Sequence, residues 1–199
     1  MKIIFEEFQA GMNNIYNSFF ISFLALKPLM ERPLLENFQI PIVGFSASCL
    51  EAAQLNKLGN DSGNEYVNSI RRHMLNDIMI CYERYATLMY VSHKAGKRVE
   101  VEERKISAAL FEKESGLYEE KEKTFFEQLR RLRNSLVHYN GVYNKANLLD
   151  YTFLNYTYNS VGHEGENIQI DFDSILYIYN EVYQKVTKIN QRYFEKNAI

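Results

Sequence analysis

The chain has 199 residues, of which 46% are hydrophobic and 24% charged, and its formal net charge is −2. This length and composition are typical of one folded domain and exclude an intrinsically disordered protein. The near-neutral charge excludes a generally basic nucleic-acid coat protein. Tyrosine and phenylalanine are abundant (15 and 13 residues), whereas only 9 glycines and 3 prolines occur, which disfavours a turn-rich all-β fold.

Neither a secretion signal nor a metal site is expected. The apolar run over residues 15–26 contains polar residues, follows Glu6 and Glu7, and is shorter than the roughly 20 residues that span a bilayer. Cys49 and Cys81 lie far apart and form no C-x-x-C pair, so a cysteine-based zinc site is not expected. We therefore expect a cytoplasmic protein with no membrane association, no metal and no cofactor.

The first elements are predicted from apolar spacing and from proline. Residues 2–26 carry aromatic and aliphatic side chains at spacings of three and four, which predicts a helix. Pro28, Pro33 and Pro41 follow closely, and this cluster predicts that the helix gives way to a loop. Pro41 is tolerated in a first helical turn, so a shorter helix is predicted over residues 41–53.

The middle of the chain is predicted to be helical as well. Residues 59–63, Gly-Asn-Asp-Ser-Gly, predict a turn, and the longest helical pattern follows it over residues 65–93. A charged amphipathic segment predicts a helix over residues 99–117, interrupted at Gly116. A further helix is predicted over residues 118–139.

Strand-like patterns precede the last helix. Residues 151–158 are aromatic and β-branched, and residues 167–172 alternate between apolar and polar side chains. Gly162 and Gly165 lie between the two segments, so the sequence predicts that they pair as a β-hairpin.

A final helix is predicted from a cap at Asp173 or Ser174 to about residue 194. Together the patterns predict one all-α domain over residues 1–199. It is a helical bundle with a small β-hairpin, residues 150–172, inserted before the last helix.

The most informative side chains lie near the end of the helix predicted over 118–139. At about 100° per residue, four apolar residues form one core stripe, namely Phe125, Leu129, Leu132 and Leu136. Asn134 and His138 lie about 160° from Leu136 on either side, so both point away from that core. With Arg130 they form a polar ridge at spacings of four residues.

This mixture of side chains suits phosphodiester chemistry. Histidine exchanges protons near neutral pH, and a guanidinium group binds phosphate through two parallel hydrogen bonds. An amide between them can orient the phosphate or the imidazole. These groups are sufficient for a phosphodiesterase that uses no metal ion. A solvated helix face without chemistry is the alternative.

Residues Arg133-Asn134-Ser135-Leu136-Val137-His138 resemble the R-x4-6-H motif of the HEPN superfamily in its R-N-x-x-x-H form. The form with Asn is expected by chance only about 0.02 times in this chain, against about 0.6 for the looser pattern. The resemblance implies an all-α bundle and a metal-independent ribonuclease that acts as a homodimer. It also implies RNA as substrate, with an antitoxin or another defence-system protein as partner.

In this interpretation the catalytic residues are Arg133, Asn134 and His138. Arg130, Arg131 and Tyr139 would contact the substrate, and the attacking group would be the RNA 2′-hydroxyl. Members paired with a nucleotidyltransferase antitoxin carry a tyrosine two residues after the histidine, where this chain has asparagine. That mode of inhibition is therefore not favoured.

Two other interpretations stay open. The chain can be a non-catalytic HEPN-like module that binds a nucleotide or RNA or holds a partner, or a helical interaction protein in which the motif is accidental. The near-neutral charge favours both over a nuclease.

Asp77 or Glu83 could supply an acidic partner to the site. The tyrosines of residues 151–158 could stack on bases, although aromatic strands more commonly pack a core.

Overall fold

The computed structural model describes residues 2–31, 52–94, 107–139, 141–145, 147–154 and 156–197. This part of the chain forms α1 (Lys2–Glu31), α2 (Ala52–His93), α4 (Ser107–Glu114), α5 (Glu120–His138), β1 (Asp150–Phe153), β2 (Tyr156–Asn159) and α6 (Phe172–Asn197). The mostly helical architecture, with a small hairpin before the last helix, is confirmed.

Part of the predicted secondary structure lies outside the described residues. This applies to Pro33 and Pro41, to nearly all of the helix predicted over 41–53, and to the first part of the helix predicted over 99–117. Within the described ranges, no helix is both long enough and apolar enough to cross a membrane.

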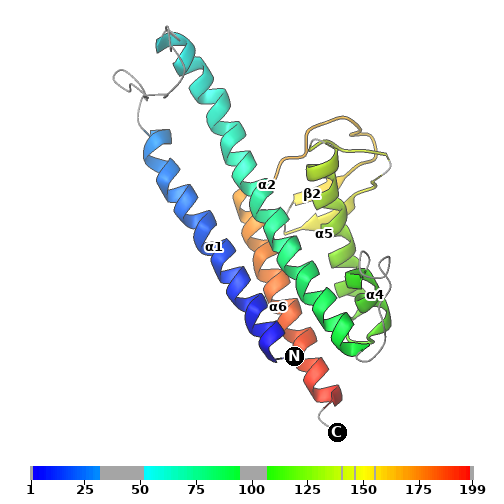
Figure 1. Ribbon diagram of the computed structural model, residues 1–199. Helices are drawn as coiled ribbons and strands as arrows, with labels where there is room; N and C mark the ends of the chain where they lie inside the picture. The colour runs from blue at the N-terminus through cyan, green and yellow to red at the C-terminus, as the bar shows by residue number, and fades with distance from the viewer. Residues whose placement is uncertain are drawn as a thin grey trace.

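α2 is the central helix of the fold. Figure 1 shows α1, α2 and α6 running side by side, with α4, α5 and the sheet next to α2 on the opposite side from α1. Among the described elements, α2 contacts each of the other four helices. The ring of Tyr85 packs on Phe8 of α1 with centroids 5.4 Å apart, whereas Tyr82 stacks on Phe126 of α5 at 3.9 Å. α2 therefore buries two different faces.

Two helix boundaries predicted from proline and glycine are wrong. α1 continues through Pro28 to Glu31. A proline weakens or kinks one turn, and the residues after it can still form helical hydrogen bonds. α2 runs without interruption through residues 59–63. Each glycine disfavours a helix by about 1 kcal/mol without forbidding it, and extending an existing helix gains a hydrogen bond with every residue.

The hairpin is shorter than predicted. Residues 151–158 do not form one strand that pairs with residues 167–172, because β1 and β2 pair antiparallel within the first segment. Phe153 lies opposite Tyr156, so only two residues connect the strands. Leu154 has a φ of 58°, the left-handed conformation that a tight two-residue hairpin turn requires. Outside the named strands, residues 167–172 contribute one isolated bridge.

The cap of α6 is Asp171, not Asp173 or Ser174 as predicted. The Asp171 carboxylate accepts the backbone N–H of Ser174 at 2.7 Å and the Ser174 hydroxyl at 2.6 Å. Partial burial alone would raise the pKa of Asp171, but these hydrogen bonds to its charged form outweigh it, and the pKa lies below its ordinary value. The charged carboxylate therefore stabilises the start of α6.

Replacing Asp171 by Ala should lower the free energy of unfolding at pH 7 by about 1 kcal/mol, the usual worth of an N-cap. A carboxyl group whose pKa is lowered on folding stabilises the protein above its unfolded pKa of about 4, and the contribution disappears as the pH falls through the folded pKa. Urea unfolding at pH 7 and pH 3 measures both effects. The matched control is Asp173→Ala, which removes a first-turn carboxylate that does not cap; equal losses for the two variants would contradict the assignment.

Candidate functional site

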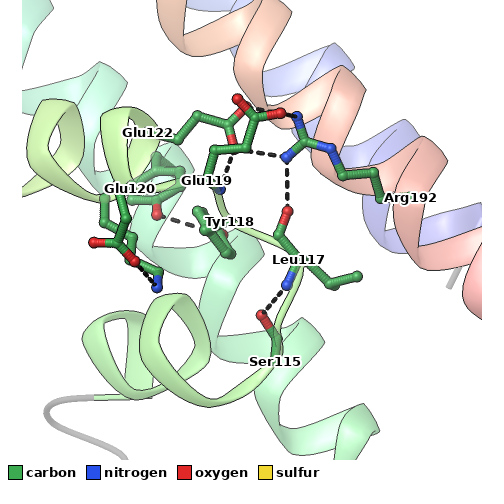
Figure 2. Close-up of polar contacts among 9 residues, drawn as sticks. Ser115, Leu117, Tyr118, Glu119, Glu120, Glu122 and Arg192 are labelled. Carbon is green, nitrogen blue, oxygen red and sulfur yellow. Dashed lines mark hydrogen bonds and ion pairs between the residues drawn. The ribbon is translucent and has the colours of Figure 1, made fainter.

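The N-terminal end of α5 is fixed by an arginine from α6. Figure 2 shows Arg192 reaching across to the segment that precedes α5. Its guanidinium group donates to the Leu117 carbonyl oxygen at 2.7 Å, to Glu122 at 2.6 Å and to Glu119 at 2.8 Å. Glu122 also accepts the backbone N–H of Glu119 at 2.9 Å, which satisfies a free donor at the helix start. One side chain of α6 thus anchors the first turn of α5.

The middle of α5 is held by a buried ion pair. Arg130 donates two hydrogen bonds to the Glu112 carboxylate of α4, at 2.8 and 2.7 Å. The side chains are 20% and 6% exposed. The Tyr82 hydroxyl of α2 donates to the same carboxylate at 2.6 Å. Burial alone would lower the pKa of Arg130, but the bonds to Glu112 outweigh it, so the pKa lies above its ordinary value. The Arg130 guanidinium group is thus committed to the interior.

The other two arginines of the motif region also have acidic partners. Arg133 donates to Glu83 of α2 at 2.7 Å, with the arginine side chain 19% exposed. The Arg133 Nε atom is buried and has no hydrogen-bond partner. Arg131, at the surface, donates to Glu127 on the same helix and to the Leu148 carbonyl oxygen at 2.7 Å. All three guanidinium charges are therefore balanced locally by carboxylates.

The loop after α5 folds back onto the helix. Gly141 donates its backbone N–H to the Ser135 carbonyl oxygen at 3.0 Å, with a φ of 75°. A Cβ atom at Gly141 would lie 2.6 Å from the Arg72 guanidinium carbon, so a larger residue would be strained there. The Asn147 amide donates to the Arg131 carbonyl oxygen and to the Ser135 hydroxyl, both at 2.6 Å. The C-terminal turn that carries His138 is thus held in place.

The outer surface of α5 carries the remaining motif side chains. The predicted core stripe of Phe125, Leu129, Leu132 and Leu136 is buried, as expected. His138 is exposed and Asn134 is half-buried. By its place on the helix the half-buried Arg131 lies beside them, at about 20° from His138. We call Arg131, Asn134 and His138 the α5 strip. Arg130, predicted to lie on this ridge, points instead to α4.

The remaining predicted residues are distributed over several places. Glu83 reaches Arg133 and so supplies the acidic partner that the sequence left open. Asp77 instead lines a cavity between α1 and α2. Tyr139, at the end of α5, is half-buried. No local sequence pattern indicated that Glu112 binds Arg130 and Tyr82, because these partners lie 18 and 30 residues away along the chain.

Comparisons with protein-family models, with curated proteins and with solved structures give no match for this chain. Among the described residues, no group of three or more His, Cys, Asp or Glu side chains lies close enough together to hold a metal ion. The site is therefore interpreted from its own geometry.

Replacing Arg130 by Met should lower the free energy of unfolding by about 3–5 kcal/mol, because it leaves the Glu112 carboxylate buried without its cation. Adding Glu112→Leu to this variant should recover much of the loss, since no buried charge then remains. The control is Arg131→Met, which breaks an exposed ion pair worth less than about 1 kcal/mol. Urea unfolding compares the variants, and a similar small loss for Arg130→Met and Arg131→Met would contradict a structural role for Arg130.

Proposed function

We propose that the chain is a metal-independent endoribonuclease of HEPN type that acts as a cytoplasmic homodimer in a toxin or phage-defence setting. The observation that carries the proposal is the placement of the R-N-x-x-x-H motif on the last turns of α5. There Asn134 and His138 lie on the outer side of the helix, and Arg133 lies partly exposed beside Glu83. An exposed imidazole and a positioned guanidinium group on one helix end are the groups that attack on a phosphodiester requires.

Helix geometry favours a site made from two copies of the chain. Arg133 and His138 are five residues apart, so they are separated by about 140° around α5. Within one chain the two side chains diverge, Arg133 toward α2 and His138 toward the outer surface. Val137 lies between the two side chains around the helix and is exposed, so a two-fold axis close to Val137 would bring the His138 of one copy toward the Arg133 of the other.

Apolar side chains flank the α5 strip and support this pairing. Val137 is 48% exposed and Leu148, whose carbonyl oxygen accepts a hydrogen bond from Arg131, is 51% exposed. Burying both in a symmetric interface removes apolar area from water and also shields the strip, which strengthens its electrostatic interactions. The exposed apolar residues beside the motif are therefore assigned to the dimer contact.

The proposed reaction uses the 2′-hydroxyl group of the RNA as nucleophile. The 2′-oxygen forms a bond to phosphorus while His138 of one copy accepts the hydroxyl proton, and the bond between phosphorus and the 5′-oxygen breaks. The leaving oxygen takes a proton from solvent water, to which His138 returns the proton that it accepted. Arg133 stabilises the charge of the pentacoordinate phosphorus, and Asn134 orients the phosphate. The products carry a 2′,3′-cyclic phosphate and a 5′-hydroxyl.

The other residues around the motif have supporting roles in the proposed reaction. Arg131 and Tyr139 contact the substrate beside the scissile phosphate, whereas Arg130 holds α5 against α4 through Glu112. A phosphate reaching Arg133 competes with Glu83 for the same guanidinium group. Glu83 therefore keeps Arg133 oriented in the absence of RNA.

The wild-type protein should cleave single-stranded RNA in the presence of EDTA, and His138→Ala should reduce the rate by at least 100-fold, on the order of the contribution of general acid–base catalysis. His93→Ala is the matched control, because His93 is another exposed histidine at the end of a long helix. Gel electrophoresis of labelled RNA measures the rate and identifies the cyclic phosphate. Cleavage by His138→Ala at the wild-type rate would overturn the assignment.

A mixed dimer tests whether the two copies share the site. Arg133→Ala and His138→Ala should each be inactive alone, whereas a co-expressed and purified heterodimer keeps one intact pair composed of His138 from one copy and Arg133 from the other. We expect part of the wild-type cleavage rate to return in the heterodimer. Complete inactivity of a correctly folded heterodimer would show that the chains do not share the site.

A second candidate is a non-catalytic module that binds RNA, a nucleotide or a partner protein. The neutralised charge of α5 favours it, because Glu112, Glu83 and Glu127 each balance one of the three arginines. Binding of RNA by the wild-type protein with no cleavage in EDTA, or after adding Mg²⁺ or Mn²⁺, would select this candidate.

A further inference from the structure

A small cavity with aromatic and amide walls lies beside the end of α5. Its volume is about 240 Å³. It is bounded by the loop after α5, by β2 and by the segment that precedes α6, and its walls include Tyr143, Tyr156, Asn159, His163, Glu166 and Gln169. This volume is below the roughly 300–1,000 Å³ of pockets for drug-sized ligands, so it suits a single ring system.

The aromatic walls are held by backbone hydrogen bonds. The Tyr143 backbone N–H donates to the Glu166 carbonyl oxygen, and Gly165 donates to the Tyr143 carbonyl oxygen, both at 3.0 Å. The ring centroids of Tyr143 and His163 are 6.1 Å apart, at an angle of 46°. On the strand side Tyr156 is 41% exposed, an unusual position for a tyrosine that packs a core. The Tyr156 ring also contacts the Tyr158 ring, with centroids 5.4 Å apart, so two supported tyrosine rings and an imidazole line the cavity.

The polar groups of the cavity supply both donors and acceptors. The His163 Nδ1 atom lies 2.9 Å from the Glu166 carboxylate, which orients the imidazole. The Asn159 side-chain oxygen accepts the Val161 backbone N–H at 2.8 Å, which leaves its amide N–H groups as donors. Gln169 is exposed, whereas its neighbours Ile168 and Ile170 are buried. This alternation places the Gln169 side chain on the outer side of the segment, where it lines the cavity. Such amides match the hydrogen-bonding edge of a base.

The charge of the cavity distinguishes a base from a phosphate. None of the described residues that line it is Lys or Arg, and Glu166 contributes a carboxylate. A phosphate group would find no guanidinium or ammonium group among these residues and would face the Glu166 carboxylate, whereas a neutral planar ring needs no cation.

The position of the cavity relates it to the α5 strip. Tyr143 follows His138 by five residues, so their Cα atoms are at most about 18 Å apart. Figure 1 shows β2 and the loops around it beside the end of α5. We propose that this cavity binds an unpaired nucleobase of the RNA a short distance from the scissile phosphate, by stacking on Tyr143 and Tyr156 and by hydrogen bonds to Asn159 and Gln169. This inference rests on the proposed function for its ligand, since RNA held at the α5 strip would bring its neighbouring bases here.

Binding of labelled oligoribonucleotides tests the proposal. Fluorescence anisotropy would measure the affinity of the His138→Ala protein, which does not cleave, for eight-nucleotide oligo-A, oligo-C and oligo-U. Tyr156→Ala should weaken binding at least about fivefold, the loss of one stacked base, and Tyr156→Phe should restore it. Gln169→Ala should change the preference among the oligonucleotides. The control Val161→Ala removes an exposed apolar side chain next to the cavity and should leave the affinity unchanged.

Free ligands separate this inference from the proposed function. In calorimetric titrations, at least one nucleoside should bind the wild-type protein and not Tyr156→Ala, whereas ribose 5-phosphate should bind neither. This result supports the cavity even if the protein cleaves no RNA, in which case only the ribonuclease assignment fails. Binding of ribose 5-phosphate as tight as that of the best nucleoside would overturn the proposal and indicate a sugar or phosphate site. If folded Tyr156→Ala and Gln169→Ala bind the oligonucleotides with wild-type affinity while the wild-type protein cleaves RNA, the proposal for the cavity is overturned and the proposed function stands.

Discussion

The carboxylate of Glu112 is the constraint on which the arrangement of α2, α4 and α5 depends. A carboxylate that is almost fully buried costs several kcal/mol unless a cation and hydrogen-bond donors surround it. Arg130 of α5 and the Tyr82 hydroxyl of α2 meet this requirement together. α4 can therefore pack only where both donors reach Glu112, and this condition sets its position along α2 and the rotation of α5.

The rotation of α5 determines what the motif can do. With Arg130 drawn toward α4 and Arg133 drawn toward Glu83 of α2, one side of the helix is committed to the interior. Asn134 and His138 are left on the other side. The same pairing explains how a chain with net charge −2 can concentrate three arginines in four residues, because nearby carboxylates balance each of them. The surface is polar rather than basic, so it exerts little long-range attraction on an anion.

The sequence predicts the faces of helices better than their partners or ends. The stripe of α5 follows from a period of 3.6 residues, which any packed helix must respect. The bond between Arg130 and Glu112 joins residues on different helices, and no local pattern encodes it. The strand-like segment was recognised, but its division at Leu154 depends on a positive φ at a leucine, a residue type that rarely adopts this conformation. The R-N-x-x-x-H motif indicated the ridge, whereas the commitment of Arg130 to the interior required the tertiary structure.

The two surfaces at the end of α5 differ in the ligand chemistry that they suit. The α5 strip offers an imidazole, an amide and a guanidinium group, which suit a charged phosphodiester, and the cavity around Tyr143 offers rings and amides with a carboxylate, which suit a neutral base. The short segment from His138 to Tyr143 joins them, and its backbone is tied to α5 at Gly141 and to residue 166 at Tyr143. Because Gly141 must keep a positive φ beside Arg72, this connection tolerates little change. If the proposed function holds, the ties at Gly141 and Tyr143 would keep a bound base and the phosphate at the α5 strip at a limited spacing, so the same loop would contribute both to affinity and to the choice of the bond to be cleaved.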